Sequence, residues 1–268
     1  MTIAAINGIE LSYEDSGGAG DPVVLVMGTG AGGRAWHLHQ VPALLDAGFR
    51  VITYDHRGIA PTSGGADSFT IDDLAADLYG LIRHLGLPRT RLAGTSMGSY
   101  VIQELALTHP EVIEQAVLLA TRGRCDTVRT AMSVAERELY DAGIRLPARF
   151  DAVLQALWNL SPRTLDDPVQ AADWLDLLEA TSGTTAGVRV QMGLDPIPER
   201  LTAYRQIRVP CRVVAFADDL ITPVHLGREV AAAIPGAEFE IIAGCGHFGY
   251  LEDPGAVNKS LVEFFRYL

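Results

Sequence analysis

Short apolar runs, each bounded by glycine, proline or polar residues, recur along the chain and predict the strands of a sheet. The clearest run is Val-Val-Leu-Val-Met at positions 23–27, which contains no polar side chain. Strands that are apolar on both faces are typical of a parallel sheet covered by helices on both sides. Comparable runs occupy residues 50–54, 91–94, 115–120, 211–217 and 239–243.

The amino-terminal residues predict a β-hairpin that precedes this series. Two strand-like segments, at 2–6 and 9–15, are joined by Asn7 and Gly8. An Asn-Gly pair between such segments is the strongest short-range hairpin signal, because both residues tolerate the positive φ angles of the turn. We therefore expect the chain to begin with two antiparallel strands.

Segments with helical periodicity lie between the predicted strands. They occupy residues 35–47, 71–85, 100–108, 226–234 and 256–267. Regular alternation of strand and helix implies βαβ crossovers. The predicted fold class is therefore α/β, with a mostly parallel central sheet and helices on both of its faces.

One long interval, 122–206, has helical periodicity but no convincing strand. We interpret it as a helical cap or lid insertion over a core domain formed by 1–121 and 207–268. A helical continuation of the main domain is the alternative interpretation. The amphipathic segments within the interval are 126–141, 150–159 and 168–180.

Residues 94–98, Gly-Thr-Ser-Met-Gly, form a Gly-x-Ser-x-Gly motif between a predicted strand and a predicted helix. This context predicts a tight, strained turn that exposes the Ser96 hydroxyl above the sheet. The first amides of the following helix would then face developing negative charge. We interpret Ser96 as a nucleophile, and an ordinary strand-to-helix turn is the structural alternative.

A serine hydroxyl is a weak nucleophile until a base removes its proton, so a histidine is expected nearby. His247 is the candidate base, because it lies in a glycine-rich turn directly after the run at 239–243. Open parallel sheets build their sites at such strand ends. His56 and His225 also lie near predicted strand ends and are weaker candidates.

An aspartate that orients the imidazole should also follow a strand, between the serine and the histidine in chain order. The run at 211–217 leads directly into Asp218 and Asp219. A carboxylate bonded to the imidazole selects its tautomer and stabilises the imidazolium that forms during the reaction. Spacing alone leaves the choice between the two aspartates open.

Ser96, the aspartate pair and His247, in that order, resemble the α/β-hydrolase superfamily, particularly its small esterases and cofactor-free haloperoxidase-like members. The resemblance covers nearly the whole chain except the helical insertion. The acid turn of the family often reads Gly-x-x-Asp-x-x-x-Pro, and Asp219 lies four residues before a proline. The resemblance therefore favours Asp219 over Asp218 as the orienting acid.

Three further segments bear on this resemblance. Residues 246–254 resemble the family's Gly-His-x(4)-Glu-x-Pro sequence, and 55–58 resemble its Asp-x-Arg-Gly turn, which is usually structural. Residues 27–30, Met-Gly-Thr-Gly, depart from the usual His-Gly of the oxyanion loop. By position, the oxyanion hole consists of the backbone amides of Thr29 and Met97. Methionine in place of histidine removes no backbone amide.

The substrate pocket is the least determined part of the predicted site. The backbone at Gly28 and Gly30 allows a close approach to substrate, and Trp158 and Phe248 offer apolar walls. Aromatic residues at helical spacing in the insertion are more often ordinary packing. Three arginines are candidates to meet a carboxylate or a phosphate, with solvation as the alternative: Arg122, Arg124 and Arg149.

Composition narrows the classes of partner. The formal net charge at pH 7 is −12, from 33 acidic and 21 basic residues, which argues against nucleic acid or an anionic membrane. Neither a signal peptide nor a long apolar span is recognised, so we expect a cytoplasmic monomer or homodimer. The spacing of Cys125, Cys211 and Cys245 indicates neither a disulfide framework nor a zinc site.

These observations predict a serine hydrolase that acts on a small-molecule carboxylic ester or thioester through Ser96, His247 and Asp219 and an acyl-enzyme intermediate. No metal or organic cofactor is expected. Family dehalogenases and epoxide hydrolases carry aspartate at the nucleophile position, so both are unlike this chain. The alternatives are a carbon–carbon bond hydrolase, a cofactor-free lyase or cyclase, a perhydrolase with haloperoxidase activity, and a non-catalytic ligand-binding receptor.

Overall fold

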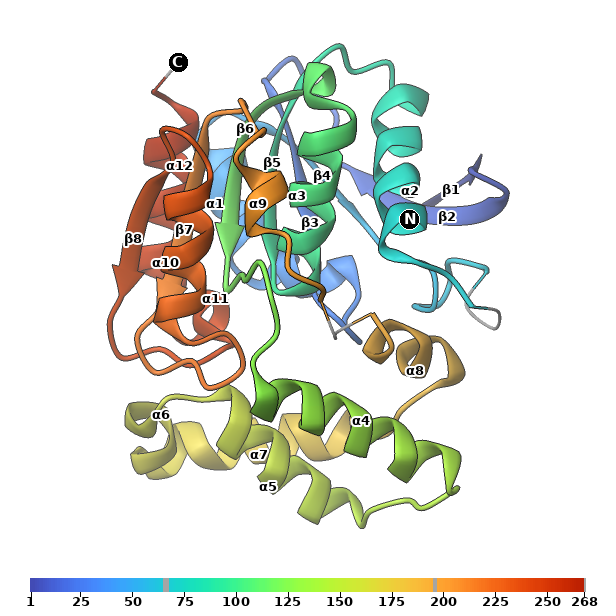
Figure 1. Cartoon of the computed structure of the whole chain (residues 1–268), viewed down its shortest axis with the longest axis vertical. Coiled ribbons are helices and arrows are strands. Elements are labelled where there is room, and N and C mark those ends of the chain that lie inside the picture. Colours follow the sequence, from blue (N-terminus) through green and yellow to red (C-terminus); the bar gives the residue numbers. More distant parts are fainter. Residues whose placement is uncertain (65–67, 195–196, 268) are drawn as a thin grey trace.

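A computed structural model describes residues 1–64, 68–194 and 197–267 of the chain. Its centre is one eight-stranded sheet with the strand order β1-β2-β4-β3-β5-β6-β7-β8 (Figure 1). The pairs β1–β2 and β2–β4 are antiparallel, and every later pair is parallel. The strands are β1 (Thr2–Ile6), β2 (Ile9–Asp15), β3 (Pro22–Val26), β4 (Arg50–Tyr54), β5 (Thr90–Thr95), β6 (Ile113–Leu119), β7 (Cys211–Phe216) and β8 (Glu238–Ile242).

The sheet confirms the predicted α/β class and a mostly parallel arrangement. The predicted hairpin forms as β1 and β2, and its turn residues Asn7 and Gly8 have φ angles of 48° and 78°. Both angles lie in the left-handed region that an Asn-Gly turn supplies at little cost. Each apolar run of the sequence coincides with a strand to within two residues at either end.

Two layers of core helices cover the sheet. Side chains of α2, α3 and α10 pack with Val24 and Val26 on one face of β3, whereas those of α1 and α12 pack with Val23 and Leu25 on the other. Alternate residues of one strand therefore enter two different cores, which explains its continuous apolar sequence. The helices outside the 122–206 interval are η1 (Gly33–Leu38), α1 (Gln40–Asp46), α2 (Ile71–His84), α3 (Met97–Thr108), η2 (Pro110–Val112), α10 (Val224–Ala233), α11 (Gly249–Glu252) and α12 (Pro254–Phe265).

The single helix predicted over 35–47 is wrong. The chain forms the 3-10 helix η1, changes direction at His39, where φ is −143°, and then begins α1. Pro42 explains the break, because its ring would clash with the carbonyl of Leu38 in a continuous helix. Within the first turn of α1 the same proline is well tolerated.

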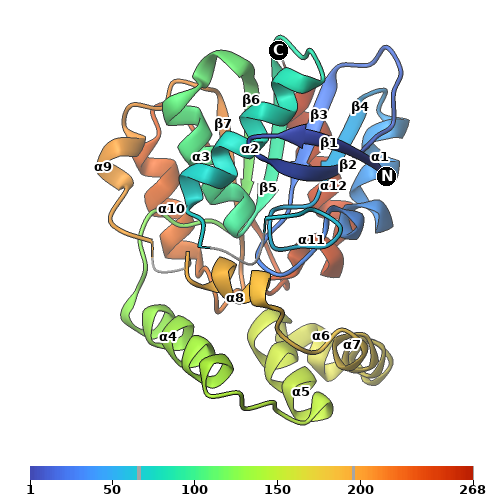
Figure 2. The same cartoon turned by 90° about the vertical axis from the view of Figure 1, so that its right-hand side faces the viewer.

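The interval 122–206 lies between β6 and β7 and is helical throughout its described secondary structure. In Figures 1 and 2, α4 to α7 form a separate layer beyond one end of the sheet, and α8 lies between this layer and the core. We refer to α4–α8 as the helical layer. The short α9 instead packs against α3 and α10. The helices of the interval are α4 (Thr127–Asp141), α5 (Ala148–Asn159), α6 (Pro162–Asp166), α7 (Pro168–Ala180), α8 (Ala186–Met192) and α9 (Leu201–Tyr204).

None of the helices in the described ranges is long and apolar enough to cross a membrane.

Candidate active site

Ser96 occupies a strained turn between β5 and α3. Its φ and ψ angles are 54° and −119°, which a residue with a side chain rarely adopts. The turn is held by bonds on both sides, since the Ser96 amide donates to the Leu119 carbonyl (3.0 Å) and its carbonyl accepts from the Tyr100 amide (3.2 Å). β5 lies at the centre of the sheet, so the surrounding strands resist relaxation of this strain.

The glycines that flank Ser96 allow three elements to approach closely. A Cβ atom on Gly94 would lie 2.6 Å from the carbonyl carbon of Gly98, and one on Gly98 would overlap the carbonyl oxygen of Val26. Any larger residue would therefore push α3 away from β5 and β3. This contact is the physical reason for the two glycines of the Gly-Thr-Ser-Met-Gly motif.

His247 and Asp219 form a buried pair at the ends of β8 and β7. The imidazole Nδ1 lies 2.8 Å from Asp219 Oδ2, and the two residues are only 7% and 3% exposed. An ionised carboxylate can only accept, so this bond places the proton on Nδ1. The lone pair of Nε2 then remains for a proton from another group.

The Asp219 carboxylate accepts several hydrogen bonds besides that of His247. Its Oδ1 accepts from the amides of Ile221 (2.7 Å) and Thr222 (2.8 Å), and its Oδ2 accepts from the Thr222 hydroxyl (2.6 Å). Burial alone would raise the pKa of Asp219, but His247 and these donors together hold that pKa below its ordinary value. Asp219 is therefore ionised at neutral pH.

The neighbouring aspartate has a different environment. Asp218 is partly exposed, and its backbone amide donates to the Cys245 carbonyl (2.9 Å). The His247 imidazole bonds to Asp219, so the geometry favours the same aspartate as the family resemblance.

Ser96 lines a pocket at the end of β5. Thr29 and Met97, the predicted oxyanion donors, line the same pocket. In the part of the chain that the structure describes, no hydrogen bond joins Ser96 to His247, and transfer of a proton between them stays a prediction. Catalytic hydrogen bonds often tighten only when substrate is bound. The other lining residues are Tyr100, Ala120, Thr121, Arg122, Gln191, Leu194, Ile197 and Thr222.

The residues predicted to contact substrate lie in different places. Gly28 packs against the nucleophile, because a Cβ on Gly28 would lie 3.2 Å from Ser96 Cβ. Gly30 donates its amide to Gln191 Oε1 (2.8 Å). Phe248 stacks on Trp174 of α7 with ring centroids 5.9 Å apart, and Trp158 is half-buried on α5. Neither Trp158 nor Phe248 is among the residues that line the pocket at Ser96.

Only one of the three arginines singled out in the sequence lines the pocket. Arg122 is buried there, and its Nη1 donates to the Ile221 carbonyl (3.4 Å). Arg124 forms an ion pair with Glu229 (2.7 Å), and Arg149 forms exposed ion pairs in the helical layer. The latter two guanidinium groups are therefore engaged away from Ser96.

Gln191 is a pocket residue that no motif in the sequence marks. Its side chain is buried and lines the pocket. Along the chain, however, the helices α4 to α7 lie between Ser96 and its own helix, α8. A glutamine within a short helix carries no local signal of such a role. The hydrogen bonds of Gln191 to the Gly30 amide and the Arg57 carbonyl, which form only in the folded chain, indicate its role.

In residues 1–64, 68–194 and 197–267, no group of three or more histidine, cysteine, aspartate or glutamate side chains is arranged to hold a metal ion. The three cysteines are free, and burial raises the pKa of the Cys211 and Cys245 thiols to about 12. Both thiols are therefore protonated, and unreactive as nucleophiles, at neutral pH.

The chain as a whole is similar to known proteins. Residues 23–260 match the Alpha/beta hydrolase family. A Mycobacterium tuberculosis H37Rv protein named as a non-heme bromoperoxidase, BpoC, is 46% identical over 96% of this chain and 98% of its own. The crystal structure of BpoC matches with a TM-score of 0.92, at 45% identity, over 96% of this chain and 95% of that one.

Two further relatives extend the range of chemistry. A Synechocystis protein named as a non-heme chloroperoxidase is 31% identical over 96% of this chain and 95% of its own. The enol-lactonase from Burkholderia xenovorans LB400 is 28% identical, with a TM-score of 0.81, over 99% of this chain and 100% of that one.

Proposed function

Because the chain belongs to the Alpha/beta hydrolase family, we propose that it is a serine hydrolase that cleaves a carboxylic ester or a thioester. The observation that carries this proposal is the strained Ser96, with φ of 54°, at the wall of a pocket that also contains Thr29 and Met97. The bonded His247–Asp219 pair supplies the base that such a nucleophile needs.

In the proposed acylation step, His247 Nε2 accepts the proton of the Ser96 hydroxyl while the oxygen attacks the substrate carbonyl carbon. The carbonyl oxygen becomes an oxyanion, which the amides of Thr29 and Met97 bind. Collapse of the tetrahedral intermediate expels the alcohol or thiol, and His247 returns the proton to this leaving group. The acyl group remains on Ser96.

In the proposed deacylation step, water attacks the acyl carbon while His247 again accepts a proton. The second tetrahedral intermediate releases the carboxylic acid and restores the Ser96 hydroxyl. Asp219 remains ionised and stabilises the imidazolium in both steps. Its lowered pKa supports this role, because the carboxylate then stays charged down to acidic pH.

The pocket wall at Ser96 combines apolar side chains with residues of the 122–206 interval. The side chains of Tyr100, Leu194 and Ile197 offer apolar surface to the acyl chain. We also propose that 122–206 acts as a cap, since Gln191, Leu194 and Ile197 bring this interval into the pocket wall.

Perhydrolysis is the second candidate function, because two relatives are named as non-heme haloperoxidases. Hydrogen peroxide in place of water would release a peracid from the acyl-enzyme. The peracid would then transfer one oxygen atom to bromide, which gives hypobromite and the carboxylic acid. The same Ser96 intermediate serves both reactions, so the two functions differ only in the molecule that attacks it.

Hydrolysis of p-nitrophenyl butyrate by the wild type and by Ser96→Ala tests the proposed function. We expect turnover by the wild type, and a loss of roughly 10⁴-fold or more in kcat for the folded variant. Equal turnover by both proteins would refute the role of Ser96. Bromination that requires both hydrogen peroxide and a carboxylate, and that exceeds ester hydrolysis, would favour perhydrolysis instead.

A further inference from the structure

We propose that Gln191 is a positioning residue that holds the oxyanion loop, residues 27–30, in place from the helical layer. The proposal rests on the proposed function, in which the Thr29 amide of this loop binds the oxyanion. Gln191 belongs to α8, whereas the loop follows β3 in the core. The alignment of an oxyanion donor would therefore depend on the docking of the helical layer.

The first observation is a bond at the carboxyl end of the loop. The Gly30 amide donates to Gln191 Oε1 over 2.8 Å. Gly30 itself is exposed, whereas the Gln191 side chain is fully buried. The Gly30 amide belongs to the peptide group that follows Thr29, so this bond restricts rotation immediately after the proposed oxyanion donor.

The second observation is a bond at the start of the loop. His56 Nε2 lies 3.1 Å from the Met27 carbonyl oxygen. Burial lowers the pKa of His56 to about 4, so the ring is neutral at pH 7. A carbonyl oxygen only accepts, hence the single ring proton lies on Nε2 and donates to Met27. Thr29 thus lies between two restrained peptide groups.

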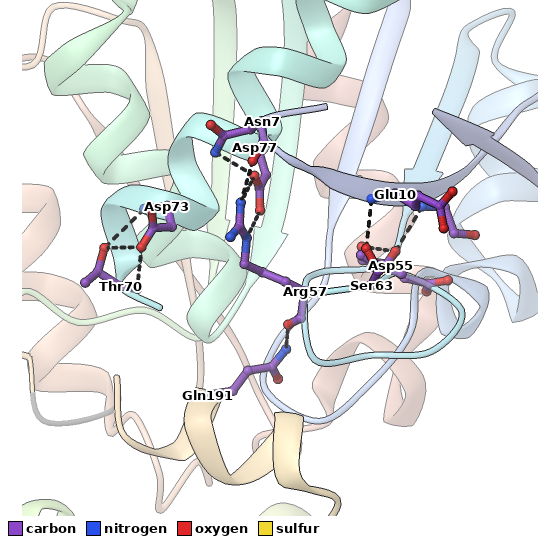
Figure 3. A network of polar contacts seen from close by, with 11 residues as sticks. Asn7, Glu10, Asp55, Arg57, Ser63, Thr70, Asp73, Asp77 and Gln191 are labelled. Carbon is purple, nitrogen blue, oxygen red and sulfur yellow. Dashed lines mark hydrogen bonds and ion pairs between the residues drawn. The ribbon is translucent and has the colours of Figure 1, made fainter. Parts of the chain in front are cut away.

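The third observation concerns the point to which Gln191 is anchored. Its Nε2 donates to the Arg57 carbonyl over 2.9 Å, directly beside His56 in the chain. The Arg57 guanidinium binds both carboxylate oxygens of the buried Asp77 at 2.6 Å each, and Asn7 also donates to Asp77 (2.8 Å) (Figure 3). The turn that contains His56 and Arg57 is therefore rigid. His56 bonds to the start of the loop, and Arg57 anchors Gln191, which bonds to the end of the loop.

Close backbone contact seats α8 against the same turn. A Cβ atom on Gly187, in the first turn of α8, would overlap the backbone of Gly58. The absence of a side chain at these two positions brings the helix near enough for Gln191 to reach both Gly30 and Arg57.

The orientation of the Gln191 amide is dictated by these partners. Its oxygen faces an amide donor and its nitrogen faces a carbonyl acceptor, so each end is already engaged within the protein. Glutamine is suited to the position because it offers both an acceptor and a donor. The geometry therefore assigns Gln191 to the support of the loop rather than to direct binding of substrate.

The decisive variant is Gln191→Met, which keeps the length of the side chain and removes both bonds. We expect kcat for p-nitrophenyl butyrate to fall roughly 10- to 100-fold, with KM changed less than about twofold, since a small displacement of a catalytic group costs this much. Gln170→Met is the matched control, because Gln170 is exposed in the helical layer and its side chain donates to Asp167 of the same layer. Its kcat should stay within about twofold of the wild type.

A second readout does not depend on catalysis. In the wild type, hydrogen exchange followed by NMR should show that the Gly30 amide is protected although the residue is exposed. Gln191→Met should raise the exchange rate of this amide at least about tenfold. If no ester is turned over even by the wild type, the proposed function fails, while the exchange rates still decide whether Gln191 holds the loop.

Two results would overturn the proposal. One is a folded Gln191→Met protein with unchanged Gly30 exchange, and the other is a rise in KM without a fall in kcat, which would indicate direct contact with substrate. If Gln191→Met fails to fold, Gly187→Ala tests the same bond through the backbone. This variant should also expose the Gly30 amide and lower kcat, and unchanged values for both would refute the proposal.

Discussion

The helical layer contacts the core on two sides of the proposed active site. On one side Gln191 of the layer forms hydrogen bonds to the core, and on the other side Glu252 of the core forms hydrogen bonds to the layer. We call the first of these contacts the oxyanion side. There the neutral side-chain amide of Gln191 accepts from the Gly30 amide and donates to the Arg57 carbonyl. Both of these partners are backbone groups of the core. The hydrogen bonds of this contact are therefore uncharged and come from a single side chain.

The second contact, the histidine side, is built around a carboxylate. Glu252 Oε1 accepts from the Ser161 amide (2.8 Å), the Ser161 hydroxyl (2.7 Å) and the Thr164 hydroxyl (2.5 Å), all at the start of α6. Its Oε2 accepts from the amide of Gly246 (2.6 Å), the residue before His247. The Phe248 amide also donates to the Asn159 carbonyl (3.1 Å).

The difference shows where the layer is held most firmly. Hydrogen bonds to a charged acceptor contribute about 1.5–3 kcal/mol each, against about 0.5–1.5 kcal/mol for neutral pairs. The histidine side has three charge-assisted bonds between layer and core, and the oxyanion side has two neutral ones. We therefore expect local separation of the layer from the core to begin at Gln191, while the turn that carries His247 stays in place.

The largest effect on the histidine side is expected from Asp219→Asn. An amide cannot hold the imidazole in the productive tautomer, so kcat for p-nitrophenyl butyrate should fall roughly 10³- to 10⁴-fold. Asp218→Asn is the matched control and should retain kcat within about threefold, since His247 bonds to Asp219 instead. The opposite ranking in steady-state kinetics would assign the orienting role to Asp218.

Glu252→Gln tests the greater strength of the histidine side. The new amide nitrogen would face either Gly246 or Ser161, and both of these are donors. We expect the free energy of unfolding in urea to fall by about 2–3 kcal/mol, more than for Gln191→Met. Glu263→Gln is the control, because Glu263 is exposed and lies 3.8 Å from Lys259, with which it forms an ion pair. Equal losses of unfolding free energy in Glu252→Gln and Gln191→Met would contradict the greater strength of the histidine side.

Acid should weaken the oxyanion side through His56. The pKa of His56 is lowered from 6.5 to about 4 on folding, so the unfolded chain binds more protons between these values. Stability from this group is complete above pH 6.5 and is lost as pH falls toward 4. Between pH 7 and pH 5 the wild type should lose about 2 kcal/mol in urea unfolding on account of His56.

His56→Asn isolates this contribution. The variant lacks the titrating ring, so the difference between its unfolding free energies at pH 7 and pH 5 should be smaller than that of the wild type by about 2 kcal/mol. His109→Asn is a suitable control, because its side chain keeps 40% of its surface exposed, whereas His56 is buried. If the two variants show the same pH dependence, His56 does not titrate as its burial implies.

Local patterns in the sequence were sufficient for much of the fold. The strands and the first hairpin were predicted because each depends on neighbouring residues, an apolar run or an Asn-Gly turn. The short helices α6, α8 and α9 were not predicted, since four to seven residues show too little periodicity to be distinguished from a loop. The break before α1 depends on Pro42, because its ring excludes a continuous helix through Leu38.

The candidate site divides in the same way. Ser96, His247 and the aspartate pair were identified from local motifs at strand ends, where chemistry and backbone geometry coincide within a few residues. The orientation of Asp219 toward His247 is set by the turn in three dimensions. Gln191 lies 161 residues from Gly30 and 134 from Arg57, and no local pattern encodes bonds across such separations. Sequence alone thus determined the reacting groups, whereas only tertiary packing decided what holds them in position, because these contacts join elements that meet only after the chain has folded.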